Sequence, residues 1–201
     1  MRDQWYGDNR DLVKWGVLLE LARRYHARHI LQVLYRRSTI WGQLEIDGEM
    51  VTMPDAVVEH FRRTGAVSAM RCPVRVEVIS EEFGNRTDYL GIILERIQSR
   101  TDFPGIVFLD PDTGLEPRVA RPEHVLESEL AQIWNGMRTC DVLVLYQHQT
   151  NRNGAPWVAQ KQSQFERVLK IAQGSAKLAR AVETPRDVAL FFAQKKAKET
   201  D

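Results

Sequence analysis

The stretch GIVFLDPDTGLEP, residues 105–117, joins an apolar run to a polar turn. Four apolar residues at 106–109 lead directly to Asp110, and Pro-Asp-Thr-Gly follows at 111–114. A strand without polar positions is typical of one that is buried on both faces of a parallel sheet. The stretch therefore predicts a central strand that displays the carboxylates of Asp110 and Asp112 where it ends.

Around this stretch the chain alternates between helical and strand-like patterns. Periodicity and capping residues predict helices at 7–25, 54–63, 86–100, 122–137 and 157–172. Apolar or alternating runs predict strands at 29–35, 74–80, 106–110, 141–149, 177–183 and 187–195, and a hairpin turning at Asp47-Gly48. This order predicts an α/β fold: a single doubly wound, mostly parallel sheet with helices on both faces and a terminal antiparallel strand pair. We expect one Rossmann-like domain over 1–201, with a hairpin insertion at 39–53 and a frayed tail at 195–201.

The composition indicates a globular protein and excludes several classes. The chain of 201 residues is 43% apolar and carries a net charge of +1, which counts against a dedicated nucleic-acid coat. Cys72 and Cys140 lie far apart, without the spacing of a disulfide framework or a structural zinc site. Residues 1–6 lack the apolar core of a signal peptide, and no apolar run reaches membrane-spanning length. We therefore expect a cytoplasmic protein without a membrane partner.

Polar side chains follow several of the predicted strands, at the edge where open α/β sheets bind their ligands. Asp110 would accept a hydrogen bond from a substrate amine or, with Asp112, hold a divalent cation. Gly114 would allow a close approach or a positive φ angle. The same five residues, 110–114, also fit a self-capped turn without any function.

Two further strand ends carry candidate residues. His148 would act as a general acid or base, and Tyr146 with Gln147 would hold a planar substrate, unless the segment is only a polar loop. Glu81 or Glu82 would bind a ribose diol, or would cap the loop that follows. The remaining histidines show no ligand spacing, and we expect them at the surface or at an interface: His26, His29, His60 and His124.

The segment GDNRDLVKWGVLLELA, residues 7–22, resembles the opening of bacterial adenine-N6 methyltransferases that act on large-subunit ribosomal RNA. The shared pattern is Gly, a polar residue, a two-residue gap, Asp, two apolar residues and Lys. The resemblance implies S-adenosylmethionine as cofactor, with Asp11 and Lys14 lining its pocket. It also implies that residues 110–113 stand in for the family's Asp-Pro-Pro-aromatic motif, which grips the target amine. The DPDTG form of this loop is similar to that of a bacterial protein family.

The sequence departs from the methyltransferase pattern at two places. The glycine-rich loop after the first strand is absent, and Tyr35, Arg36 and Arg37 stand there, with Gly42 further on. The aromatic residue that would stack on the target base is replaced by Thr113.

Three hypotheses about function remain open. The first is a divergent methyltransferase acting on a nucleobase or a small molecule, with Asp110, Lys14, Glu82 and His148 in its site. The second is a non-catalytic Rossmann-like module that binds a nucleotide or a partner, distinguished by side chains that fill the site. The third is a phosphodiesterase or nuclease that uses Mg²⁺. The carboxylates of Asp110 and Asp112, with Glu82, would hold the cation, and His148 would activate water. The phosphate would be neutralised by Arg36, Arg37 and Arg152.

Overall fold

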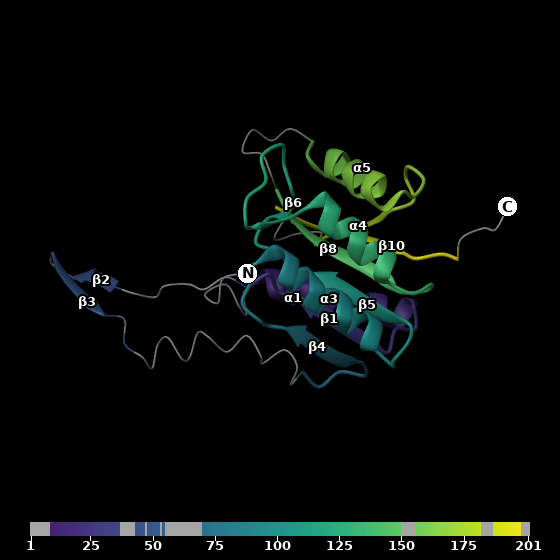
Figure 1. The fold of residues 1–201 in the computed structure, drawn as a ribbon, viewed down its shortest axis with the longest axis horizontal. Coiled ribbons are helices and arrows are strands. Elements are labelled where there is room, and N and C mark those ends of the chain that lie inside the picture. The colour runs from purple at the N-terminus through teal and green to yellow at the C-terminus, as the bar shows by residue number, and fades with distance from the viewer. Residues whose placement is uncertain are drawn as a thin grey trace.

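The computed structural model describes residues 9–36, 43–46, 48–52, 54, 70–149, 156–181 and 187–197 (Figure 1). Its helices are α1 (Asn9–Arg24), α3 (Arg86–Ser99), α4 (Glu127–Gly136) and α5 (Val158–Leu169). Six strands form the main sheet: β1 (His29–Val33), β4 (Arg75–Ile79), β5 (Gly105–Leu109), β8 (Val142–His148), β9 (Lys177–Ala179) and β10 (Val188–Gln194). Two short pairs complete the described part: β2 (Gln43–Ile46) with β3 (Glu49–Thr52), and β6 (Gly114–Leu115) with β7 (His124–Val125).

The main sheet has the strand order β4-β1-β5-β8-β10-β9. Its first four strands are parallel to one another, and β10 runs antiparallel to both β8 and β9. The structure thus confirms the predicted α/β fold, with a mostly parallel sheet and a terminal antiparallel pair. Because β5 and β1 are interior strands, the end of β5 lies at the middle of the carboxyl edge.

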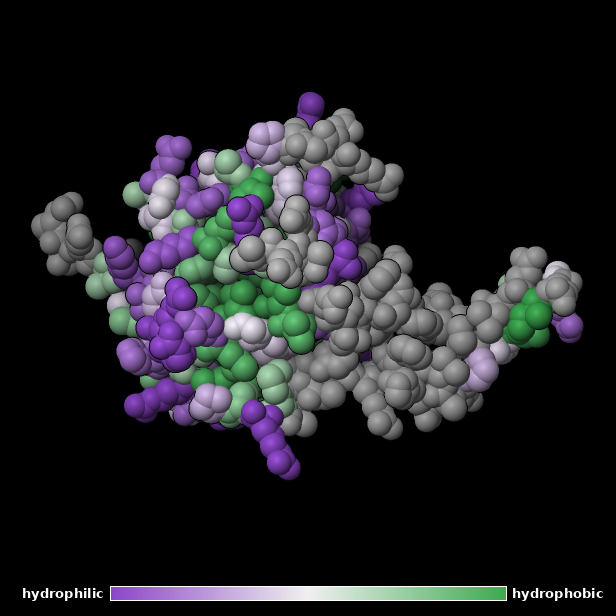
Figure 2. Space-filling model, turned by 180° about the vertical axis from the view of Figure 1, so that it is seen from behind, coloured by the Kyte–Doolittle hydropathy of each residue, from purple (hydrophilic) through white to green (hydrophobic). Residues whose placement is uncertain are grey.

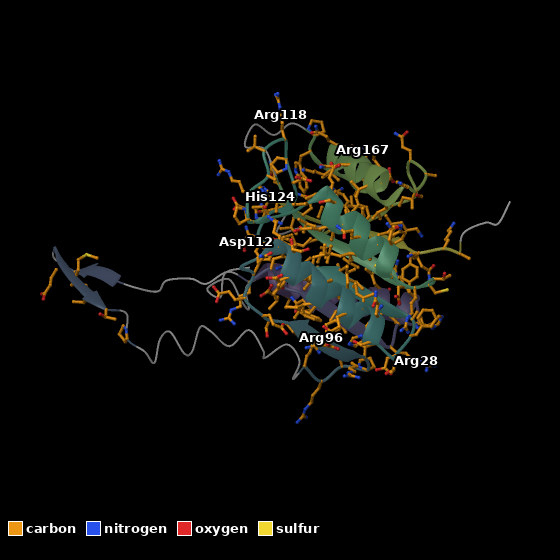
Figure 3. The ribbon with its side chains drawn as sticks, in the orientation of Figure 1. Arg28, Arg96, Asp112, Arg118, His124 and Arg167 are labelled. Atoms are coloured by element: carbon orange, nitrogen blue, oxygen red, sulfur yellow. The ribbon has the colours of Figure 1, made fainter. Side chains whose placement is uncertain are left out.

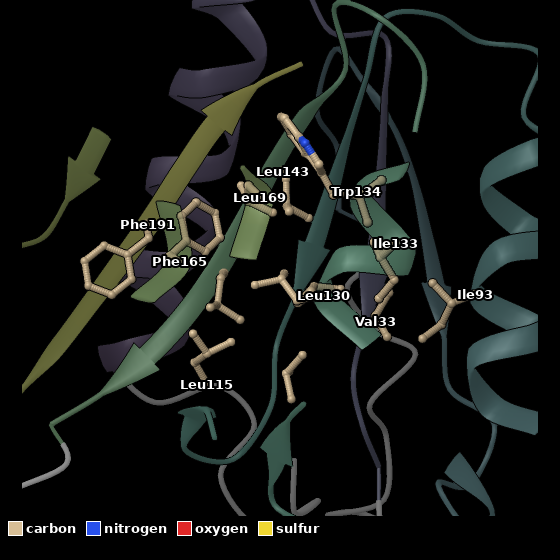
Figure 4. Close-up of a cluster of buried hydrophobic side chains, with 14 of the residues drawn as sticks. Val33, Ile93, Leu115, Leu130, Ile133, Trp134, Leu143, Phe165, Leu169 and Phe191 are labelled. Carbon is tan, nitrogen blue, oxygen red and sulfur yellow. The ribbon is translucent and has the colours of Figure 1, made fainter. Parts of the chain in front are cut away.

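Helices cover both faces of the sheet. Because successive residues of a strand point to opposite faces, neighbouring residues of β5 pack against different helices. Val107 and Leu109 of β5 pack with the cluster under α3, α4 and α5, part of which is drawn in Figure 4. Ile106 and Phe108 pack instead with Trp15 and other residues of α1. All four β5 side chains are fully buried, which is why the run carries no polar position.

The hairpin predicted around Asp47-Gly48 is present as the antiparallel pair β2 and β3, separate from the main sheet. Gly48 has a φ of +83°, as such a turn requires. Asp47 itself, and the helix predicted at 54–63 apart from Pro54, lie outside the described residues.

Helix α4 begins at Glu127, five residues later than the periodicity predicts. His124 and Val125 instead form β7 beside β6. The carboxylate of Glu116 accepts a hydrogen bond from the Glu127 backbone N–H at 2.6 Å, which satisfies one of the donors left without a partner at a helix start. Since Glu116 follows β6, the helix boundary depends on a contact that local periodicity does not contain.

The segment predicted to fray begins with Lys195, which is in fact held in place. Its Nζ donates to the carbonyl oxygens of Trp134, Asn135 and Met137 at 2.6–2.8 Å, at the end of α4. A cation at a helix C-terminus satisfies open carbonyl groups and complements the helix dipole. Residues beyond 197 lie outside the described part.

Two of the histidines expected at the surface or at an interface are buried within the chain itself: His29 is 1% exposed and His124 is 9% exposed. Seen from behind, the molecule shows an apolar area bordered by hydrophilic residues (Figure 2). In the described part of the chain, no helix combines the length and the apolar character needed to cross a bilayer.

Candidate functional site

Two residues of α1 meet the end of β5 in a buried ion pair. Nζ of Lys14 lies 2.8 Å from Oδ1 of Asp110 and 3.1 Å from Oδ1 of Asp11. Gln32, from β1, donates its Nε2–H to the other Asp110 oxygen at 2.9 Å. Asp110 is fully buried, and the side chains of Lys14 and Asp11 are less than 10% exposed. The structure therefore brings together three residues that the sequence placed at this edge, in an arrangement closed to solvent.

This ion pair is a charge–charge contact rather than a directed hydrogen bond, because Oδ1 of Asp110 accepts no well-aligned donor. Burial alone would lower the pKa of Lys14, but the charges of Asp110 and Asp11 outweigh it and raise that pKa above its ordinary value. The Lys14 ammonium also lies 4.3 Å from the centre of the Tyr146 ring, a cation–π distance. Lys14 is thus held as a cation and is not an available base.

The turn after Asp110 is fixed from beneath by Gln147. Its Nε2 donates to the carbonyls of Thr113 and His148 at 3.0 and 2.9 Å, and its Oε1 accepts from the Leu115 N–H at 2.8 Å. Gln147 is fully buried, so the expectation that it holds a planar substrate is wrong. Its amide is used to hold the turn.

Gly114 meets both requirements expected of it. Its φ is +117°, and a Cβ at this position would lie 2.5 Å from the Gln147 side chain. Asp112, in the same turn, is half-buried and lies at the end of the sheet seen at the left in Figure 3. The described residues contain no group of three or more His, Cys, Asp or Glu side chains placed to hold a metal ion.

A second, more exposed cluster lies beside the ion pair. His148, at the end of β8, has its Nε2 3.2 Å from Oδ2 of Asp187, and Arg10 donates to the same oxygen at 2.7 Å. About a third of each side chain is exposed: 33% for His148, 31% for Asp187 and 35% for Arg10. The His148 ring also makes an edge contact with Tyr146. A histidine–carboxylate pair that solvent reaches is suited to proton transfer or to binding an anion.

Sequence reasoning selected His148 but missed Asp187 and Arg10. Asp187 directly precedes β10, and because β10 is antiparallel its start lies at the carboxyl edge of the other strands. The sequence contained a signal for Asp187, because the last strand was predicted to be antiparallel. In an antiparallel strand the start, rather than the end, lies at the carboxyl edge of the other strands. Arg10 gave no comparable signal.

The pKa of His148 should respond in opposite directions to two substitutions. Burial lowers this pKa most, Asp187 raises it and Arg10 lowers it. We therefore expect Asp187→Asn to lower the His148 pKa further and Arg10→Gln to raise it. Titration of the His148 ring signals by NMR measures both, and shifts in the same direction would contradict this geometry.

The segment after β1 is filled by apolar side chains. Leu34 and Tyr35 are buried, and Tyr35 takes a φ of +47° and packs against Phe83 and Tyr89 at ring-centre distances of 5.5 Å. In the resemblance drawn above, this is where a glycine-rich loop would let a methyl donor lie against the backbone. The described residues therefore do not fit S-adenosylmethionine bound in that way, and Arg37 and Gly42 lie outside them.

The two acids after β4 differ in their surroundings. Oε1 of Glu81 lies 3.7 Å from Nη2 of Arg96, so this carboxylate is directed to α3. Glu82 is exposed, and the following Phe83 N–H donates to the carbonyl of Arg36 at 2.6 Å, which ties this segment to the end of β1. Both acids are exposed, and Glu82 is the one whose carboxylate has no cation beside it among the described residues.

No family model and no curated protein matches this chain. Among solved structures, a DUF574 family protein from Streptomyces avermitilis MA-4680 is similar, with 12% identity, a TM-score of 0.46, and coverage of 93% of this chain and 82% of that one. A protein from Thermobifida fusca YX, described as a candidate methyltransferase, has 16% identity and a TM-score of 0.42, with coverage of 94% and 80%. At these identities and TM-scores neither protein indicates what this chain binds or does.

Proposed function

We propose that this protein is a methyltransferase-like binding module rather than a working methyltransferase. The observation that carries the proposal is the closed ion pair at the end of β5. A target amine needs a reachable acceptor, and Asp110 is fully buried against Lys14 and Gln32. An internal lysine thus takes the place that a substrate amine would need. The apolar filling after β1, by Leu34 and Tyr35, supports the same conclusion.

The ligand that best suits the open part of this edge is a nucleoside or nucleotide, for which adenosine and AMP are the probes. In nucleotide-binding sheets, an acid that follows the strand beside the first one accepts hydrogen bonds from the ribose hydroxyls. Glu82 follows β4, which pairs with β1, and its carboxylate is exposed. Glu81 does not meet this requirement because it faces Arg96.

Glu82→Gln is expected to weaken adenosine or AMP binding about tenfold, since a charged hydrogen bond is worth about 1.5–3 kcal/mol and 1.4 kcal/mol is a factor of ten. Isothermal titration calorimetry on the full chain measures this. Glu81→Gln is the matched control and should bind as the unmodified chain does. Equal losses in both variants, or no binding by the unmodified chain, would refute the nucleotide proposal.

The second candidate is S-adenosylmethionine-dependent methyl transfer to a nucleic acid or a small molecule. It is favoured by the strand order, in which antiparallel β10 lies between β8 and β9. Such an ending is the one that methyltransferase sheets favour, although a fold alone does not establish an activity. Transfer of a labelled methyl group to RNA, DNA or a metabolite extract would favour this candidate over the binding module.

The Mg²⁺-dependent alternative has less support. Both Asp110 oxygens face groups of the protein itself, so this carboxylate does not present a free edge to a cation. Asp112, His148 and Glu82 are open to solvent to different degrees, and in the described part they do not belong to a group of three or more ligands that could hold a metal ion.

A further inference from the structure

The opposite, amino edge of the sheet holds a polar cavity of about 150 Å³. It lies between the starts of β1 and β4 and the end of α3. Charged and polar side chains dominate its lining: His29, Arg75, Glu77, Arg96, Arg100 and Asp102. Figure 3 shows Arg96 and Arg28 well away from Asp112, which marks the carboxyl edge. This cavity is therefore separate from the candidate site described above.

Two deeply buried residues at the base of the cavity carry nitrogen atoms without hydrogen-bond partners. The Arg100 side chain is 3% exposed, and its Nη2 donates to Asp141 at 2.6 Å, whereas its Nη1 has no partner. His29 is 1% exposed, and neither of its ring nitrogens makes a hydrogen bond. An unpaired buried polar group costs about 1–3 kcal/mol, and more when it is charged. Nη1 of Arg100 and Nδ1 of His29 thus have no hydrogen-bond partner among the described residues, whereas Nε2 of His29 lies near the Glu77 carboxylate without an aligned hydrogen bond.

The two arginines at the mouth of the cavity are held only loosely. Arg75 is 63% exposed and lies 3.5 Å from Asp102, and Arg96 is 48% exposed and lies 3.3 Å from Glu77. Exposed ion pairs of this kind contribute little, so their guanidinium groups can exchange one acceptor for another. Glu77 also lies 3.3 Å from Nε2 of His29.

The lining is rich in hydrogen-bond donors that an oxyanion can use. Three guanidinium groups, Arg75, Arg96 and Arg100, line the cavity together with the carboxylates Glu77 and Asp102. Asp141 balances the charge of Arg100 at 2.6 Å, so the cavity offers directed donors rather than an excess of positive charge. A guanidinium presents a planar set of donors that matches phosphate oxygens in pairs.

We propose that this cavity is a binding site for a small oxyanion of the phosphate type. Arg75 and Arg96 bind it at the mouth, and Arg100 and His29 supply the base of the site, directly or through water. The volume accommodates one tetrahedral oxyanion with a water molecule. The proposal does not depend on the function assigned to the carboxyl edge.

Inorganic phosphate is the probe for this site, titrated into the full chain by calorimetry and by NMR of the arginine and histidine side chains, with chloride keeping the ionic strength constant. We expect saturable binding that shifts the His29 and Arg100 signals. Arg75→Gln and Arg96→Gln should each weaken it about tenfold, the effect of losing one charged hydrogen bond. Both residues are largely exposed, so these variants should fold.

Arg28→Gln is the matched control, because Arg28 is exposed at the same edge and does not line the cavity. Affinity unchanged in this variant, with loss in the other two, supports the site. Equal weakening in all three variants would mean nonspecific attraction to the basic edge. That result, or phosphate binding that leaves the His29 and Arg100 signals unmoved, or no binding at all, overturns the proposal.

Discussion

Replacing Lys14 with methionine should lower the free energy of unfolding by about 3–5 kcal/mol, the usual cost of removing one partner of a buried ion pair. Methionine keeps most of the apolar stem that passes Tyr146, so the loss reports the missing charge. Asp110 would keep one hydrogen bond, from Gln32, but no cation, and Asp11 would lie beside it with the same charge. Urea denaturation measures the change.

A double-mutant cycle separates the charge effect from general loss of packing. Combining Lys14→Met with Asp110→Asn removes both charges, and we expect the double variant to be more stable than the sum of the two single losses predicts, by at least about 1–2 kcal/mol. Additive losses would mean that the two side chains do not stabilise each other. A loss below about 1 kcal/mol for Lys14→Met would contradict burial of the pair.

The pH dependence of this stabilisation has a definite sign. The pKa of Lys14 is raised in the folded chain above its ordinary value of 10.5, so its contribution is complete below that pH and is lost only as the pH rises beyond it. The stability difference between the unmodified chain and Lys14→Met should therefore be constant between pH 7 and pH 9.

Gly114→Ala is expected to cost about 2–4 kcal/mol, from two additive causes. A side chain at a φ of +117° is strained by about 1–3 kcal/mol. In addition the new Cβ would lie 2.5 Å from the Gln147 amide, which must then give up some of the hydrogen bonds that hold the turn. Urea denaturation again measures the loss.

Gly174→Ala supplies the matched control for this prediction. Gly174 also has a positive φ, +79°, but no atom lies within 4 Å of the place a Cβ would take. Its loss should be near 1 kcal/mol, from backbone strain alone. If the two substitutions cost the same, the contact between Gly114 and Gln147 contributes nothing.

The central strand β5 was predictable because helices cover both of its faces, so none of its side chains at 106–109 can be polar. Every side chain from 106 to 109 packs against helices on one face or the other, so the pattern in the sequence and the burial in the structure have the same cause. The start of α4 was not predictable in the same way. The Glu127 backbone N–H in its first turn donates to Glu116, a residue brought there by the fold.

For the candidate site, location was predictable but contacts were not. Asp110 was assigned to the carboxyl edge, and the resemblance placed Asp11 and Lys14 at a cofactor pocket, yet nothing in their spacing showed that Lys14 reaches Asp110. That contact depends on how closely α1 packs on the sheet, which is set by residues elsewhere in the core. Gln147 illustrates the same limit, because a buried amide and a substrate-binding amide look alike in sequence.

The position of β10 has a consequence for how the protein is made. This strand follows every other strand in sequence but lies inside the sheet, between β8 and β9. Until Gln194 has left the ribosome, β8 has an unpaired edge and β9 has no neighbour in the main sheet. The nascent chain must therefore keep a long apolar strand edge from pairing with other chains until β10 has emerged, and chaperone dependence should be greatest in that interval.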